Sequence, residues 1–320
     1  MSLAFFSALF LLLLLLLPPP SLPSPIPSLS TLSSPPLTLH VLGTAHVSSC
    51  SSDAVARAFE QLEPDAVCLE LCHERAPGLL AALPGVASER VPGAGRPPLL
   101  LSLISSLQSR YAAGQNVTVG ADFLAALDHC HRSASPPPVL LLDRPLSLTV
   151  SRLTSSLSPF SKLRLVLSLL LQSLLSPFLA GRTRRYLAAA LADGSLVERE
   201  LAKLAKSLPR VHEVLVKERD EYLAAKLLQA CERVREERGG APVVVLAVLG
   251  KGHQAAVLRR VEAGLGQGRA PPVRGALLEE SFKGGGGGGR YTEEERRHLA
   301  EEIVLCEMPP PPDRSAAPPA

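Results

Sequence analysis

Two histidines each follow a glycine by three residues, and these two pairs are the residues most able to do chemistry in this chain. Gly43 precedes His46, and Gly250 precedes His253; an apolar run ends at each glycine. Glycine permits a tight turn, and neutral imidazole is a common ligand of divalent metal ions. The repeated spacing in matching contexts favours a site that uses both histidines.

A carboxylate lies in a third apolar run. Ala66–Leu71 is apolar except for Glu70. Because neighbouring parallel strands end at the same edge of a sheet, we expect His46, Glu70 and His253 to converge there. Imidazole and carboxylate together suit a metal ion that polarises a carbonyl and activates water. The alternative is that the glycines only permit turns and the histidines hydrogen-bond to neighbouring backbone.

The apolar runs also predict the elements that would position these residues. Leu37–Leu42 and Ala66–Leu71 are predicted as strands around a helix, because apolar residues recur at helical spacing between Ala54 and Leu62. Val243–Leu249 is predicted as a strand followed by a helix from Ala255. We therefore expect an α/β fold with a central sheet made of two βα-type halves, each with a strand-GxxH-helix unit. A helical insertion over about residues 147–238 interrupts them.

A further strand is predicted at Val139–Leu142, and it ends at Asp143 and Arg144. This places an acid and a base at a strand terminus, as at the two GxxH units. Two interpretations are open. Asp143 and Arg144 contact the residues of the candidate site and hold them in place, or they form a local ion pair that fixes a turn.

Five segments, in this order, carry a resemblance to a known family: GTAHVS, LEPDAVCLELCHER, LLDRPLSLTVSR, VKERDEYLAAKL and VVVLAVLGKGHQAAV. They resemble the TraB/PrgY family, which is similar to the Tiki and GumN proteins, over about Leu37 to Arg260. In that superfamily the two GxxH motifs, a strand glutamate and an arginine gather at one site. Tiki-like members are regarded as metal-dependent proteases.

The resemblance implies roles for individual residues. Arg219 aligns with the arginine of the family's R-[DN] motif, so Glu70 and Arg219 would be catalytic, and His46, Glu70 and His253 would bind a divalent ion such as Mn, Co or Zn. The substrate or partner would be a peptide or protein. A catalytically inactive, membrane-associated binding or regulatory protein of the same fold is the alternative. Gly250-x-Gly252 also resembles a dinucleotide fingerprint, but the acid expected about twenty residues later is missing.

Composition excludes some classes of protein. The chain has 320 residues, a net charge of +3, 4% aromatic residues and no Trp, which argues against nucleic-acid binding. Its six cysteines include no C-x-x-C spacing. We expect reduced, mostly buried thiols, which favours a domain that faces the cytosol.

The ends of the chain differ from its middle. Residues 1–36 comprise a hydrophobic run, Leu3–Leu17, and a Ser/Pro-rich linker; the run is short for a bilayer span, and no Lys or Arg precedes Arg57. We expect membrane association without a conventional span, for example at an organelle outer membrane such as the mitochondrial one; the secretory pathway is the alternative. The TraB-like domain is expected over 37–280. Residues 281–320 are expected to form a Gly-rich linker, a short helix at Thr292–Cys306 and a disordered Pro/Ala tail.

The leucine-rich stretch Leu165–Leu175 has two interpretations. Lys162, Arg164 and Gln172 argue against a full membrane span. We expect a buried helix of an all-α insertion, and a membrane-lying hairpin is the alternative.

Overall fold

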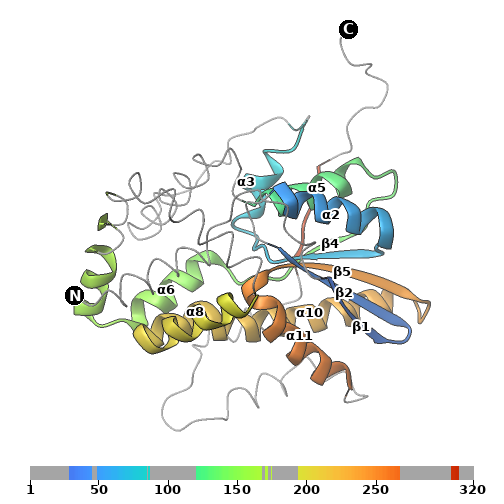
Figure 1. The fold of residues 1–320 in the computed structure, drawn as a ribbon. Helices are drawn as coiled ribbons and strands as arrows, with labels where there is room; N and C mark the ends of the chain where they lie inside the picture. The colour runs from blue at the N-terminus through green and yellow to red at the C-terminus, as the bar shows by residue number, and fades with distance from the viewer. Residues whose placement is uncertain are drawn as a thin grey trace.

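The computed structural model describes residues 29–44, 49–84, 86, 120–167, 170, 171, 174, 194–266 and 304–309. Within these ranges, six strands form one sheet with the order β1-β2-β5-β3-β4-β6 (Figure 1). The strands are β1 (Leu29–Ser34), β2 (Leu37–Thr44), β3 (Ala66–Leu69), β4 (Val139–Leu141), β5 (Val243–Gly250) and β6 (Val304–Leu305). The four inner strands run parallel, and β1 and β6 pair antiparallel at the two edges. The expected α/β fold is confirmed.

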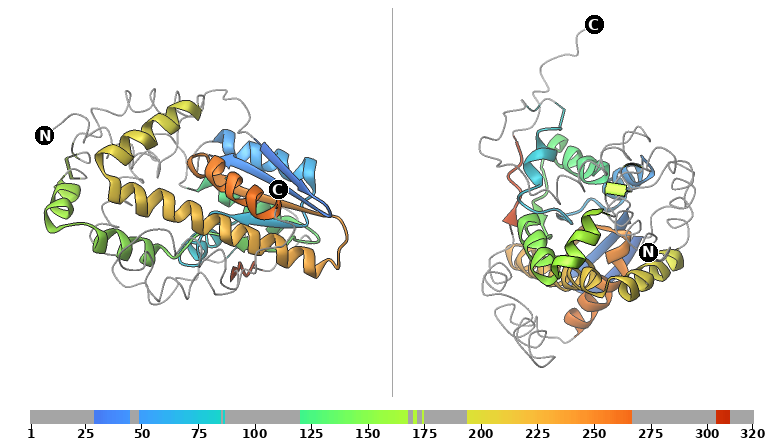
Figure 2. Two further views of the ribbon diagram at one scale, coloured as in Figure 1. Left: turned by 90° about the horizontal axis from the view of Figure 1, so that it is seen from below. Right: turned by 90° about the vertical axis from the view of Figure 1, so that its left-hand side faces the viewer.

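Helices cover both faces of the sheet (Figures 1 and 2). One face is covered by α2 (Ser49–Leu62), α3 (Ala76–Leu80) and α5 (Ala121–Arg132). The other face is covered by α10 (Glu218–Glu237) and α11 (Lys251–Gly266). Beside these lie α6 (Leu146–Ser156), α8 (Gly194–Ser207), α9 (Pro209–His212) and a π-helical turn, η1 (Glu213–Lys217).

The two GxxH strands are neighbours at the centre of the sheet. β2 pairs with β5 in parallel along its whole length, and Thr44 lies opposite Gly250. Every residue of β5 except Val244 is buried. A strand that is buried on both faces needs an apolar residue at almost every position, which is why β5 appears in the sequence as a continuous apolar run. β2 lies next to the edge strand, and its Thr38 and His40 are only half-buried.

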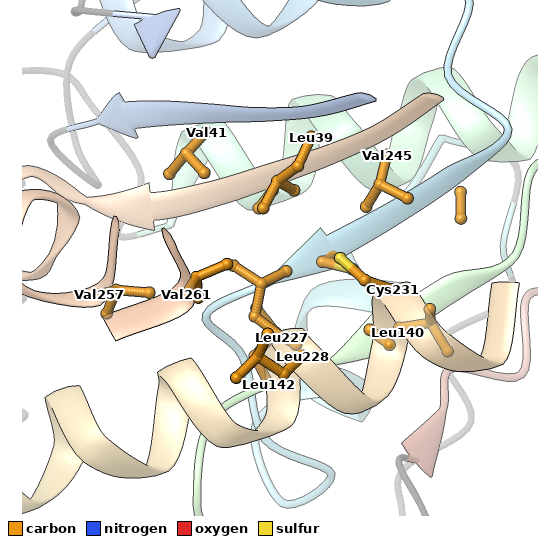
Figure 3. Packing of buried hydrophobic residues seen from close by; sticks show 14 of the residues in the cluster. Leu39, Val41, Leu140, Leu142, Leu227, Leu228, Cys231, Val245, Val257 and Val261 are labelled. Carbon is orange, nitrogen blue, oxygen red and sulfur yellow. The ribbon is translucent and has the colours of Figure 1, made fainter. Parts of the chain in front are cut away.

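Helix α10 supplies much of the core on its face of the sheet. Its apolar residues recur every three or four positions and pack against β2, β4 and β5, as Figure 3 shows for Leu227, Leu228 and Cys231. This helix falls at the end of the stretch expected as a helical insertion, yet it is part of the main core. It also begins with charged residues, two of which, Arg219 and Asp220, belong to the candidate site described below.

Two segments at the ends of the domain differ from expectation. Leu29–Ser34 was expected in a linker because it is rich in serine, but it forms the edge strand β1, where polar side chains are tolerated. Thr292–Cys306 was expected as a helix, but its last part forms β6, which pairs with β4. Residues 292–303 lie outside the described residues. Cys306, which directly follows β6, is buried in the hydrophobic cluster on this side of the sheet.

The leucine-rich stretch also differs from expectation. Its described residues are helical, but most of their side chains are exposed instead of buried in a helical core. Leu165 is the exception, because it is buried. Among the residues that the structure describes, no helix combines the length and the apolar character needed to cross a bilayer.

The five cysteines with described side chains are free and buried: Cys68, Cys72, Cys130, Cys231 and Cys306. Burial raises the pKa of Cys130 and of Cys231 to about 12. At pH 8 about one such thiol in ten thousand is a thiolate, the reactive form.

We therefore expect Ellman's reagent to titrate at most one thiol rapidly in the native chain, namely Cys50, and all six after unfolding in urea. The measurement is the absorbance of the released thiolate dye with and without urea. Rapid reaction of two or more thiols in the native chain would contradict the described burial.

Candidate functional site

The centre of the candidate site is an ion-paired arginine from the first turn of α10. Arg219 Nη2 donates to Glu70 Oε1 at 2.7 Å and to Asp143 Oδ2 at 2.9 Å, and its Nε donates to Asp143 Oδ1 at 3.2 Å. Glu70 directly follows β3, and Asp143 follows β4 by two residues. All three side chains are at least nine-tenths buried. Two parallel strands therefore present their end residues to one guanidinium.

Glu70 also connects two strand ends. Its Oε2 accepts a hydrogen bond of 2.6 Å from the backbone N–H of Gly250, the last residue of β5. The backbone N–H of Glu70 donates in turn to Val248 of β5. Each carboxylate oxygen of Glu70 thus accepts a hydrogen bond from a different donor. These two bonds fix the side chain at the point where β5 ends and α11 begins.

His253 lies in the first turn of α11 and completes the described cluster. Its Nδ1 is 2.6 Å from Asp220 Oδ1, and its Nε2 is 3.2 Å from Arg219 Nη1 and 3.6 Å from Glu70 Oε1. An ionised Asp220 favours the proton on Nδ1, which leaves Nε2 as the acceptor. The imidazole therefore directs a lone pair towards Arg219 and Glu70.

The pKa of Arg219 reflects these neighbours. Burial lowers the pKa, but the charges of Asp143 and Glu70 and the hydrogen bonds to them raise it more, so the net pKa lies above the ordinary arginine value. Arg219 is therefore cationic at any working pH. Glu70, Asp143 and Asp220 together carry three formal negative charges against this one positive charge, so the cluster has an excess of negative charge.

Arg144 lies apart from the cluster, although it adjoins Asp143 in the chain. Its guanidinium binds residues of α6 and α10 instead: Nη1 donates to Glu218 Oε2 at 3.0 Å and Nε donates to Thr149 at 2.9 Å. Arg152 of α6 binds the second oxygen of Glu218 at 2.6 Å. The two residues at this strand end thus have separate functions: Asp143 binds Arg219, and Arg144 anchors the neighbouring Glu218.

Gly43 is required by the close approach of α11. A Cβ placed on Gly43 would overlap Gln254 Oε1, so no larger residue fits unless Gln254 moves. Gln254 is held there because its amide nitrogen donates to the carbonyl of Val41 at 3.0 Å. The first GxxH glycine thus brings the helix of the second GxxH unit against β2. Gly250 instead contributes the N–H that binds Glu70.

His46 lies outside the described residues, so its expected convergence with the cluster stays a prediction. Its strand is placed, because Thr44 ends β2 directly beside Gly250 of β5. Thr44 donates through Oγ1 to Asp122 at the start of α5. The chain therefore enters the first GxxH turn at the edge of the sheet where Glu70 and His253 lie.

The donor atoms of the cluster meet some of the requirements of a metal ion. Within the described ranges, no three His, Cys, Asp or Glu side chains are arranged to hold an ion. The pair formed by His253 Nε2 and Glu70 Oε1, 3.6 Å apart, is close to the separation of about 3.4 Å expected for two ligands on a tetrahedral ion. The spacing of these two donor atoms therefore fits two ligands of one metal ion. Arg219 contacts both of them, so an ion would have to displace two of its hydrogen bonds.

Asp220 is a member of the cluster that the sequence did not single out. It stands next to Arg219 in a run of charged residues, which resembles the solvated face of a helix. The signal that could have found it is the acid that follows Arg219 in the R-[DN] motif, since consecutive helical residues can reach different neighbours: Arg219 reaches two strand ends and Asp220 reaches the first turn of α11. Glu218 was missed for the same reason.

The fold and the cluster together define an α/β protein in which the ends of parallel strands and the first turns of two helices, including Gly250 and His253 of the second GxxH unit, meet at one edge of the sheet. The chain belongs to the TraB/PrgY/gumN family, whose profile matches residues 28–261. It is 28% identical to the TraB domain-containing proteins of mouse and human over 237 residues, which is 67% of this chain and 60% of each relative. An uncharacterized protein of Methanocaldococcus jannaschii is 23% identical over 228 residues, 69% of this chain and 52% of that protein. The chain thus spans between about half and three-fifths of these relatives.

Proposed function

We propose that this chain is a divalent-metal-dependent hydrolase of peptide bonds. The observation that supports the proposal best is the pair of donors, His253 Nε2 and Glu70 Oε1, which lie 3.6 Å apart in a cluster with excess negative charge. A divalent cation would offset that excess. His46 is proposed as a further ligand.

The described residues would prepare the site in defined ways. A bound ion would polarise the peptide carbonyl and lower the pKa of its water. Asp220 holds the imidazole of His253 by Nδ1, so that Nε2 stays available as a donor. The N–H of Gly250 holds one oxygen of Glu70 and leaves the other to act as a ligand or to accept a proton from water.

Arg219 is proposed to stabilise the negative charge that develops on the carbonyl oxygen. When its bonds to Glu70 and His253 are released, it keeps both hydrogen bonds to Asp143. A cation that is held in place by a carboxylate needs little reorganisation during the reaction, and this makes electrostatic stabilisation effective. The substrate class is a peptide or a protein segment.

The decisive experiment compares cleavage of a peptide library by the intact chain with Mn²⁺, Co²⁺ or Zn²⁺ supplied. We expect the variants His46→Ala, Glu70→Gln and His253→Ala to lose bound metal and to lower turnover by about a hundredfold or more. The control is His129→Gln on α5. This helix covers the face of the sheet opposite to α10 and α11, which carry Arg219 and His253. Metal content is measured by elemental mass spectrometry of the purified protein.

Two outcomes contradict parts of this proposal. Cleavage that survives chelation would reject the metal while keeping a protease. A wild-type chain that binds no metal and cleaves nothing would favour the second candidate, a binding or regulatory protein without catalysis. The observation in favour of that candidate is Arg219, whose guanidinium contacts both prospective ligand atoms.

We also propose that the chain associates with a membrane through Leu3–Leu17 and that its folded domain faces the cytosol, at an organelle outer membrane such as the mitochondrial one. The apolar run supports the first part, and the buried free thiols support the second.

Fractionation of cells that express the full chain, or a chain that starts at Ser28 and so keeps β1, tests the association. We expect the full chain in the membrane fraction and the shortened chain largely in the soluble fraction. An equal distribution of the two would reject this role for the run.

A further inference from the structure

The helical segment after α6 exposes a row of large apolar side chains. Phe160 is 74% exposed and Leu174 is 72% exposed. The row, here called the apolar stripe, consists of Phe160, Leu163, Leu167, Leu170, Leu171 and Leu174. Figures 1 and 2 place the start of this segment, coloured green, beyond α6 at the side of the molecule away from the sheet. An exposed contiguous row of this kind marks an interaction surface.

The spacing of the stripe places its members on one face of the helix. At about 100° per residue, the six side chains fall within an arc of about 100°. Leu165 points in the opposite direction, and it is buried. The helix therefore packs on the domain by one side and leaves the apolar stripe on the other.

Along the sequence, the charges near the stripe have one sign. Between Arg144 and Ala192 the sequence contains seven Lys and Arg residues and no Asp or Glu. Arg144 and Arg152 bind Glu218 instead. Of the other five cations, the structure describes Lys162 and Arg164. Lys162, within the helix itself, is exposed. An apolar stripe in a segment that is free of acids complements the surface of a lipid bilayer, which has anionic headgroups outside and apolar acyl chains beneath them.

We propose that the apolar stripe is a docking surface for an anionic lipid bilayer, on which the helix lies parallel to the membrane plane. A second copy of the chain fits less well, because two such helices would bring cationic segments together without any acid to pair with them. The surface is independent of the cluster around Arg219. If the experiments below reject the docking surface, the peptidase proposal is unchanged.

The stripe is distinguishable from the N-terminal run by its charge. No cation precedes Arg57, so binding through Leu3–Leu17 depends on apolar burial alone. Binding through the stripe includes attraction to anionic headgroups, so it weakens when salt is added or when the vesicle is neutral.

The chain contains no Trp, so Phe160→Trp creates a single fluorescent reporter within the stripe of the full-length protein. With vesicles of phosphatidylcholine and phosphatidylserine we expect its emission to shift to the blue and to be quenched by brominated lipid chains. With pure phosphatidylcholine we expect a much smaller shift. The control is Leu305→Trp, at a position on β6 that is exposed to a similar extent as Leu170, and it should report no insertion.

Binding itself is measured by vesicle co-sedimentation of the full-length double variant Leu167→Glu/Leu171→Glu. We expect its partition onto anionic vesicles to fall by about tenfold or more, because two apolar contacts are lost and two repulsive charges are added. The double variant Leu167→Ser/Leu171→Ser separates the two causes and should show a smaller loss. All positions are exposed, so the melting temperature should stay within a few degrees of wild type.

Three results would overturn the proposal. The first is an emission of the Phe160→Trp variant that is blue-shifted without vesicles, which would mean that the stripe is covered by the chain itself. The second is a shift that depends on protein concentration instead of lipid, which would mean a second copy. The third is equal partition of wild type and the Glu double variant, which would mean that the stripe does not contact the bilayer.

Discussion

Replacing Arg219 with methionine is expected to lower the free energy of unfolding by about 3–5 kcal/mol, because the buried Glu70 and Asp143 would lose the cation between them. Methionine preserves most of the side-chain volume, so the loss measures charge and hydrogen bonding more than packing. The measurement is urea unfolding followed by circular dichroism. Metal binding to Arg219→Met provides a second measurement, since Glu70 Oε1 and His253 Nε2 no longer contact a competing guanidinium.

The matched control is Arg219→Lys. Lysine keeps the positive charge but cannot reproduce the planar fork that reaches Glu70 and Asp143 together. We expect an intermediate loss of about 1–2 kcal/mol. If Arg219→Met costs less than about 1 kcal/mol, as an exposed ion pair would, the cluster does not have the buried geometry described here.

The second large effect is expected at the buried pair of Arg144 and Glu218. Both side chains are 2% exposed. Glu218→Met leaves a buried guanidinium without its carboxylate and should cost about 3–5 kcal/mol. Arg144→Met should cost less, because Glu218 keeps Arg152 as a partner at 2.6 Å.

A double-mutant cycle separates the pair from its surroundings. We expect Arg144→Met/Glu218→Met to be more stable than Glu218→Met alone, with a coupling of at least about 2 kcal/mol. Arg152→Ala is the control, since that side chain is partly exposed and its loss should cost about 1 kcal/mol or less. Additive losses in the two single variants would show that Arg144 and Glu218 do not interact in solution.

The central strands could be predicted from the sequence, because burial on both faces leaves a continuous apolar run. β2, β3 and β5 were expected within one or two residues of their observed ends. The edge strands could not be predicted in this way, since β1 consists mostly of serine, threonine and leucine and β6 has two residues. Their pairing depends on the neighbouring strand instead of on their own composition.

The candidate site was predictable in part, for two different reasons. Glu70 and His253 follow from strand ends and turn spacing, whereas Arg219 came from the family resemblance, because a charged residue at the start of a helix is usually on the surface. Asp220 was missed because only the fold shows that α10 places its first turn over the strand ends. The exposure of Leu167 and Leu170 was missed because periodicity identifies an apolar face but not what covers it.

The first three residues of α10 are charged and have three separate sets of partners. Glu218 binds Arg144 and Arg152, Arg219 binds Glu70 and Asp143, and Asp220 binds His253. Rotation of the helix by one residue, about 100°, would therefore disrupt all three sets at once. The π-helical turn η1 lies directly before Glu218, so a change in its length would rotate the helix. An apolar substitution along α10 would thus disturb the core only locally, whereas an insertion or deletion of one residue in η1 would change the whole charge arrangement.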